Sequence, residues 1–214
     1  MCGVIGYWPL DLGKAPEARQ LAFHRLFEES CIRGLHAYGL SDLREGGKLR
    51  TFKTHNRDKI LEQFDPSLPT IAHTRYCQSG DWRVLENNQP IMAAGMALVF
   101  NGVIHMGTKE EFEAAFDVKC DADNDGEVFL RRLEKRDDPA VFLSQMTGSF
   151  AGLWLTEKGL YAGRNPRRPL WRNNHLGAVW YGSTRDIFLR AGFPEPEEVI
   201  VNRLAVVEFW GEVV

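Results

Sequence analysis

The sequence lacks several features that would define its class directly. No hydrophobic run approaches the ~20 residues of a transmembrane helix, and the N-terminus has no signal-peptide pattern. The four cysteines (residues 2, 31, 77 and 120) have no paired spacing, so the sequence indicates neither a zinc site nor a disulfide framework. These absences favour a soluble cytoplasmic protein with no cofactor, no bound metal and no membrane partner.

The sequence also lacks a strong excess of either positive or negative charge. The net charge is −3, without a long run of like charges, which argues against nucleic acid as the main partner. The short basic cluster at 164–172 fits a phosphate or carboxylate site, or a solvated face, better than a reader of a DNA groove. With 44% hydrophobic residues and no linker, the chain is expected to form a single domain over 1–214.

Short strands and helices alternate along the chain, and strands dominate its second half. Helices are predicted at 16–32, 60–64, 108–116, 125–136 and 139–146. Strands are predicted at 3–8, 69–76, 96–100, 149–155, 159–163, 178–182 and 205–210, with a turn at Asn101-Gly102 after the third. Strands at both ends with helices between them favour an α+β sandwich of two sheets covered by helical layers.

Cys2 directly follows the initiator methionine and is the most informative residue. Removal of Met1 would give a chain that begins with a thiol and a free α-amine on the same residue. An α-amine titrates near ~7.7–8.0 and can therefore serve as the base for that thiol. The alternative is that Cys2 is an ordinary apolar residue at the start of a strand.

A series of motifs follows Cys2 in order. It comprises RG at 33–34 with Gly39, HTRY at 73–76 with Gly80, NQP at 88–90, FNGVI at 100–104, DGE at 125–127, GSF at 148–150 and RPL at 168–170. From residue 2 to about 190 the series resembles the glutaminase domain of class II glutamine amidotransferases, which are N-terminal-nucleophile hydrolases. The resemblance implies a four-layer αββα sandwich that hydrolyses the glutamine side-chain amide through a thioester on Cys2, giving glutamate and ammonia.

The resemblance also assigns roles to individual residues. It gives the Asn101 side chain and the Gly102 N–H to the oxyanion hole, Arg75 to the substrate α-carboxylate, and Asp125 to the substrate α-ammonium. Arg33 would support the end of the chain that carries the nucleophile. The chemistry agrees, because the tetrahedral intermediate needs donors and a planar guanidinium suits a bidentate carboxylate. The alternatives are a plain hairpin turn at Asn-Gly and an exposed arginine in a surface ion pair.

Tyr76 and Gln78 complete the expected substrate site. Gln78, after Cys77, stands where the family has a threonine that helps to bind the substrate carboxylate. His36 stands where the family has an aspartate. We expect specificity for substrate or partner to reside at Gln78 and His36.

A calcium loop is a competing interpretation of 121–132. Residues 121–128 fit the first eight positions of an EF-hand loop, but Arg132 occupies the twelfth, where a bidentate carboxylate is required. The calcium interpretation is therefore the weaker one.

Glutamine is thus the expected substrate. Because no acceptor domain follows the motif series within 214 residues, we expect a separate synthase subunit to receive the ammonia. Two alternatives remain: a stand-alone amidohydrolase that acts on a γ-glutamyl compound, and a non-catalytic relic of a glutaminase domain that binds or regulates a partner.

Overall fold

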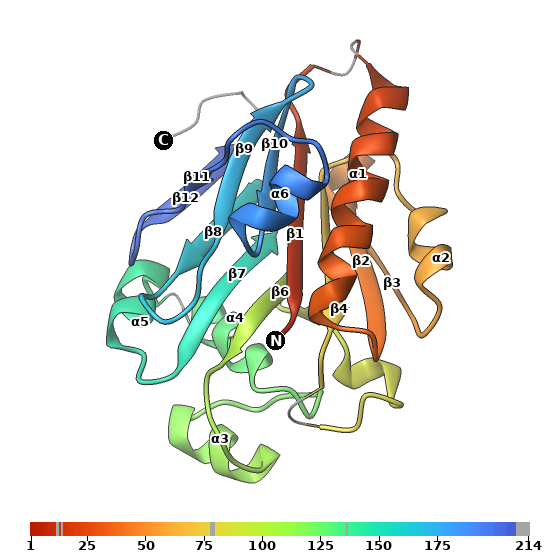
Figure 1. The fold of residues 1–214 in the computed structure, drawn as a ribbon. Helices are drawn as coiled ribbons and strands as arrows, with labels where there is room; N and C mark the ends of the chain where they lie inside the picture. The colour runs from red at the N-terminus through yellow and green to blue at the C-terminus, as the bar shows by residue number, and fades with distance from the viewer. Residues whose placement is uncertain (12, 14, 78–79, 136, 209–214) are drawn as a thin grey trace.

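Two antiparallel sheets lie face to face in the computed structural model, which describes residues 1–11, 13, 15–77, 80–135 and 137–208 (Figure 1). The first sheet contains, in spatial order, β11 (Glu197–Glu198), β9 (Trp171–His175), β10 (Ala178–Gly182), β1 (Gly3–Pro9), β4 (Thr70–Arg75), β2 (Ala37–Arg44) and β3 (Lys48–Thr54). The second contains β12 (Leu204–Glu208), β8 (Gly159–Arg164), β7 (Ser149–Leu155), β6 (Met96–Val103) and β5 (Ile91–Ala93).

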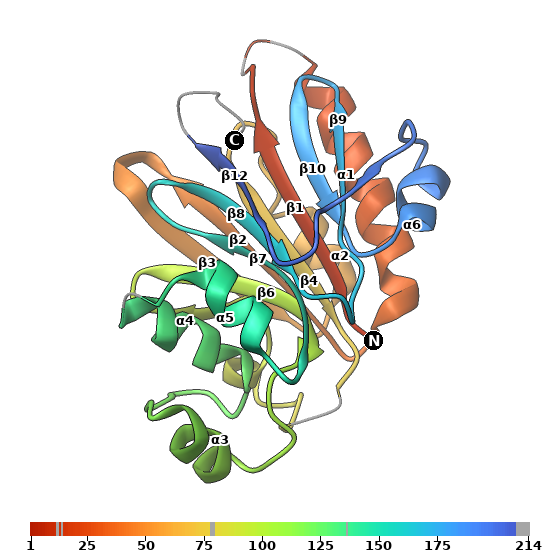
Figure 2. The ribbon, with the colours of Figure 1, turned by 90° about the vertical axis from the view of Figure 1, so that its left-hand side faces the viewer.

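Helices cover both outer faces, so the layers follow the order αββα (Figure 2). The first sheet packs against α1 (Pro16–Ser30), α2 (Arg57–Leu61) and α6 (Arg185–Arg190). The second packs against α3 (Lys109–Phe116), α4 (Gly126–Glu134) and α5 (Pro139–Gln145). The sandwich predicted from the sequence is therefore confirmed. None of the described helices is long and apolar enough to cross a membrane.

Strand alternation divides the buried side chains among three cores. In β1, Val4 faces the other sheet and Ile5 faces α1, and both are fully buried. In β6, Val99 lies between the sheets while Leu98 packs toward the outer helices. Because successive side chains of a strand point to opposite faces, an apolar strand buried on both sides joins two cores. This arrangement holds β1 and β6, which carry the candidate site, in a packed centre.

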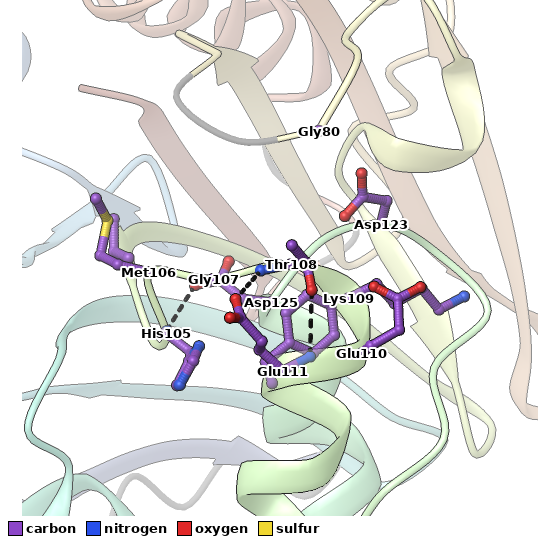
Figure 3. Close-up of a pocket in the computed structure, with 12 residues that line it drawn as sticks. Gly80, His105, Met106, Gly107, Thr108, Lys109, Glu110, Glu111, Asp123 and Asp125 are labelled. Carbon is purple, nitrogen blue, oxygen red and sulfur yellow. Dashed lines mark hydrogen bonds between the residues drawn. The ribbon is translucent and has the colours of Figure 1, made fainter.

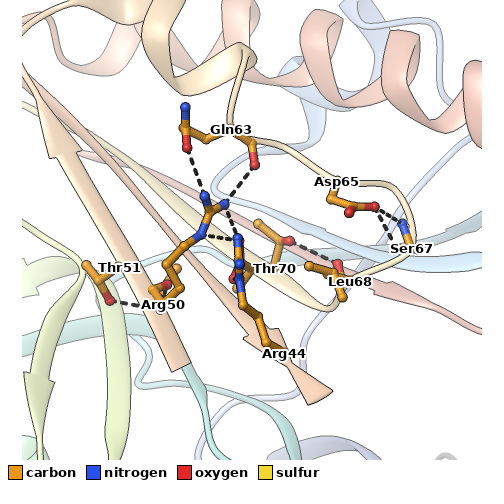
Figure 4. Close-up of polar contacts among 10 residues, drawn as sticks. Arg44, Arg50, Thr51, Gln63, Asp65, Ser67, Leu68 and Thr70 are labelled. Carbon is orange, nitrogen blue, oxygen red and sulfur yellow. Dashed lines mark hydrogen bonds and ion pairs between the residues drawn. The ribbon is translucent and has the colours of Figure 1, made fainter. Parts of the chain in front are cut away.

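A polar network fixes the far end of the first sheet (Figure 4). Asp42 on β2 is fully buried, and its carboxylate accepts hydrogen bonds from Arg44 and from two nitrogens of Arg50 on β3. Arg50 also donates to the side chain and to the carbonyl of Gln63, after α2. One buried carboxylate thereby joins the β2–β3 hairpin to the segment that follows α2.

Several element predictions were displaced or incomplete. The helix predicted at 16–32 ends at Ser30 and continues as a 3-10 turn, η1 (Cys31–Arg33), and the short helix predicted at 60–64 lies at 57–61. The turn predicted at Asn101-Gly102 is wrong, because both residues continue β6 and pair with Ala151 and Phe150 of β7. The strands at 37–44, 48–54 and 171–175 and the helix at 185–190 were not predicted. Residue 136 and residues 209–210, at the ends of two predicted elements, lie outside the described residues.

Candidate active site

Cys2 lies at the start of the central strand β1, where it meets β6 of the other sheet. Its backbone N–H donates to Asn101 Oδ1 over 3.2 Å, and its carbonyl accepts from Arg33 Nε over 2.8 Å. At Gly3 a Cβ atom would lie 2.3 Å from Thr74 Oγ1, so the residue after the cysteine must be glycine. Cys2 is thus anchored by two of the residues predicted to surround it.

The Asn101 side chain is the most informative polar group of the site. Asn101 is buried, and its Nδ2 has no hydrogen-bond partner among the described residues, although Oδ1 is paired with Cys2. A buried donor without an acceptor costs free energy, so such a group commonly marks a functional position. A Cβ at Gly102 would lie 1.9 Å from the Ser149 carbonyl oxygen, which explains the glycine at this point of β6.

Burial affects both ionisable groups at the N-terminus. It raises the pKa of the Cys2 thiol, so the thiol needs a base to become a nucleophile at neutral pH. Burial lowers the pKa of the Met1 amine; the charge of Cys2 opposes this, and the positive charges of Arg33 and Arg168 lower the pKa further.

Arg75 ends β4 and is buried, with 4% of its surface exposed. The alternative of an exposed strand-end arginine is therefore wrong. Its guanidinium donates to the Asn87 carbonyl and to Asn88 Oδ1, the latter over 2.7 Å, and approaches Cys77 Sγ at 3.7 Å. Arg75 is therefore oriented by Asn87 and by Asn88, the first residue of the NQP motif.

Asp125 precedes α4 and is also buried. Its Oδ2 accepts from the backbone N–H groups of Ile104, over 2.6 Å, and of His105, over 3.0 Å, which fixes the chain after β6. Burial raises the pKa of its carboxyl group, and those two hydrogen bonds oppose the rise. The carboxylate therefore belongs to the same end of the sandwich as Asn101.

Asn87 connects the segments of Arg75 and Asp125, and the sequence analysis did not assign it a role. Its carbonyl accepts from both Arg75 and Asn124 Nδ2, the latter over 2.9 Å. Its Oδ1 accepts from the Asp123 N–H over 2.9 Å. The signal in the sequence was the polar run at 87–89, which the motif series included only from residue 88.

A cavity of about 680 Å³ opens beside Asp125 (Figure 3). Gly80, Val103 and His105 line it with the start of α3. Cys2 and Asn101 are not among its lining residues, so the cavity extends the Asp125 side of the site. Its volume is within the usual range for small-molecule sites.

The carboxylates of the supposed calcium loop have other partners. Two of the side chains that would bind the ion are Asp121 and Asp125, at the first and fifth positions of the loop. Asp121 pairs with Arg131, and Asp125 accepts from two backbone N–H groups after β6. Among the described residues no group of three or more His, Cys, Asp or Glu side chains could hold a metal ion.

Tyr76 contacts Cys2 through its backbone. Its carbonyl accepts from Cys2 Sγ over 3.5 Å, while its ring is half-exposed and lies against His36. Gln78, predicted to bind substrate, lies outside the described residues. Of the predicted site residues, Arg33, Tyr76 and Asn101 contact Cys2 directly. Asn87 links Arg75 to residues 123–124, which directly precede Asp125.

Known proteins were compared with this sequence and fold. No family model matches the sequence. A relative called amidophosphoribosyltransferase, from Lacticaseibacillus casei, is 28% identical over 190 residues, which cover 79% of this chain and 93% of the relative. The PRPP amidotransferase of B. subtilis, solved with ADP and GMP, superposes with a TM-score of 0.73 at 22% identity over 98% of this chain.

This chain spans only about half, 48%, of that B. subtilis protein. A class II glutamine amidotransferase domain protein from Silicibacter pomeroyi superposes with a TM-score of 0.57 at 11% identity, covering 99% of this chain and 96% of its own. In its fold the chain is similar to class II glutamine amidotransferase domains, and its sequence is similar to an amidophosphoribosyltransferase, which supports the resemblance seen in the motif series.

Proposed function

We propose that the chain is a glutaminase in which Cys2, after removal of Met1, is the nucleophile. The observation that carries the proposal is the buried Asn101 Nδ2, a donor without an acceptor among the described residues, on the side chain that holds Cys2. An oxyanion that forms on a substrate bound to Cys2 would supply the missing acceptor. Because that acceptor exists only during the reaction, the hydrogen bond would stabilise the transition state selectively.

In the proposed reaction, the Cys2 thiol adds to the side-chain carbonyl of glutamine while its proton passes to the α-amine of the same residue. Asn101 Nδ2 and the Gly102 N–H donate to the resulting oxyanion. Its collapse breaks the C–N bond, and the α-ammonium of Cys2 returns the proton to the departing ammonia. Water then hydrolyses the thioester, which releases glutamate and restores the thiol.

Substrate recognition is proposed to use two opposite charges. The Arg75 guanidinium would bind the α-carboxylate of glutamine, and the Asp125 carboxylate its α-ammonium. The proposal is supported by the burial of both side chains and by Asn87, which links Arg75 to the segment directly before Asp125. A site that requires both charges would reject glutamine within a peptide, where neither end is free.

The test is ammonia release from the purified chain with three substrate classes. Free glutamine should be hydrolysed, glutamine-containing peptides should not, and Cys2→Ala should abolish turnover. A much higher kcat/KM on a γ-glutamyl amide than on glutamine would favour the stand-alone amidohydrolase. No ammonia from any substrate, in protein that lacks Met1, would favour the non-catalytic relic.

We further propose that the ammonia is used by an acceptor on a separate subunit that docks around Cys2. Large apolar side chains are exposed there: Ile32 (69%) and Leu35 (69%) flank Arg33, and Tyr76 (49%) contacts Cys2. Exposed apolar groups that gather around a functional site are typical of interaction surfaces. PRPP is the first acceptor to test, since the relatives are named for it.

The subunit proposal is tested with a matched pair of surface substitutions in protein co-purified with its synthase. Ile32→Asp should leave glutamine hydrolysis unchanged but abolish the transfer of ammonia to the acceptor. The control is Leu21→Asp, because Leu21 is another exposed large apolar side chain but lies on α1. Equal transfer by both variants, or brisk solo turnover with no synthase in any preparation, would contradict a separate acceptor subunit.

A further inference from the structure

His36 makes a set of contacts that the proposed chemistry does not use. Its Nδ1 accepts the Cys77 backbone N–H over 2.9 Å, so in this state the ring is neutral and its proton is on Nε2. Its ring stacks on Tyr76, with centroids 5.2 Å apart and planes 26° apart. On Trp82 the corresponding values are 5.4 Å and 22°. One imidazole therefore contacts both ends of the segment 76–82.

That segment carries three contacts of the candidate site. The Tyr76 carbonyl accepts from Cys2 Sγ, and Cys77 Sγ lies 3.7 Å from the Arg75 guanidinium. Cys77 Sγ also donates to the Gly80 carbonyl over 3.1 Å, and Gly80 lines the cavity beside Asp125. A change in the peptide between residues 76 and 77 would therefore reach the nucleophile and the proposed carboxylate site together.

The other end of the segment is held independently of His36. The Trp82 carbonyl accepts from Asn88 Nδ2 over 2.8 Å, and Asn88 Oδ1 in turn accepts from Arg75. His55 packs edge-on against the Trp82 ring. Trp82 is thus held in place by contacts other than His36. The His36 ring packs on Trp82 and accepts a hydrogen bond from the Cys77 N–H, so it links Trp82 to the 76–77 peptide.

We propose that His36 is a positioning residue for glutamine: its Nδ1 fixes the 76–77 peptide, and through it the substrate-binding side of the site. The inference rests on the proposed function and deepens it. Because the acceptor atom, rather than the ring, makes the decisive contact, an asparagine at position 36 should replace the histidine, since its Oδ1 reaches nearly the same point as Nδ1. A phenylalanine keeps the stacking between Tyr76 and Trp82 but has no acceptor.

The test compares His36→Asn, His36→Phe and His36→Ala with the wild-type chain. Loss of one hydrogen bond to a partly buried amide should raise the KM for glutamine about tenfold in the Phe and Ala variants, with kcat changed less. His36→Asn should stay within about threefold of wild type, since the acceptor is kept. The control is His24→Asn on α1, where the histidine contacts Gln20, and no kinetic change is expected.

A second measurement does not depend on catalysis. In ¹⁵N-labelled protein, hydrogen exchange of the Cys77 amide should be slow in wild type and His36→Asn and fast in His36→Phe. If the wild-type chain does not hydrolyse glutamine but this pattern holds, the proposed function fails while the positioning contact stands. Kinetics of His36→Asn as poor as those of His36→Ala, or a Cys77 amide equally protected in all variants, would overturn the inference.

Discussion

Replacing Asn101 with aspartate removes the proposed oxyanion donor while it keeps the shape of the side chain. Oδ1, which accepts from the Cys2 N–H over 3.2 Å, remains, so residue 2 should stay anchored. The Nδ2 position becomes a carboxylate oxygen, which cannot donate and repels the developing negative charge. Because the group is buried, water cannot take over its role.

The size of the effect follows from the loss of one of two proposed donors. Removal of a single oxyanion-hole donor lowers kcat by about 10²–10³, or about 2.7–4 kcal/mol of transition-state stabilisation. The KM for glutamine should change little, because the oxyanion is absent from the ground state. The assay is steady-state ammonia release, and Asn174→Asp on the exposed part of β9 is the matched control.

The comparison requires that the Asn101→Asp variant is folded. A Tm within a few degrees of the wild-type value would establish this. If Asn101→Asp retained more than about a tenth of wild-type kcat, the unpaired amide would not be an oxyanion donor. A rise in KM at constant kcat would equally contradict the role, since it would place Asn101 in ground-state binding.

Two further outcomes are expected. Asp42→Asn should lower the free energy of unfolding in urea by about 1–3 kcal/mol, because Arg50 loses a buried carboxylate partner, and an unchanged midpoint would refute the structural importance of that network. Because burial raises the pKa of Asp125 and the proposed binding of the α-ammonium needs its charged form, kcat/KM should fall on acidification at a pH above the ordinary aspartate value of 3.8. That acid limb should disappear in Asp125→Asn; its persistence there would assign it to another group.

The sequence predicted the buried strands best. Strands β7 and β10 have the predicted bounds, since their residues are almost all apolar and turn residues follow them. Strand β3 was missed because it carries lysine, arginine and threonine on a half-exposed edge, without apolar alternation. At Asn101-Gly102 the local turn preference was overridden by pairing with β7, which only tertiary structure supplies.

The site was predicted from motif order rather than from local pattern. Cys2, Arg33 and Asn101 are far apart in sequence, and their expected proximity came from the family resemblance. The connecting role of Asn87 could not be predicted, because its contacts reach residues 12 to 37 positions away that only the tertiary structure brings together. His36 was noted as a departure from the family and as a position of expected specificity, but its contact could not be predicted, since the bond to Cys77 spans 41 residues of sequence.

The central claim, that a processed Cys2 is the nucleophile, is tested most directly by active-site labelling of the enzyme. A glutamine-mimicking diazoketone is added to active protein, and the labelled peptides are identified by mass spectrometry. The account predicts one label per chain, on a Cys2 that is the first residue and has a free α-amine. A label on Cys31, Cys77 or Cys120, or full activity in protein that retains Met1, would contradict it.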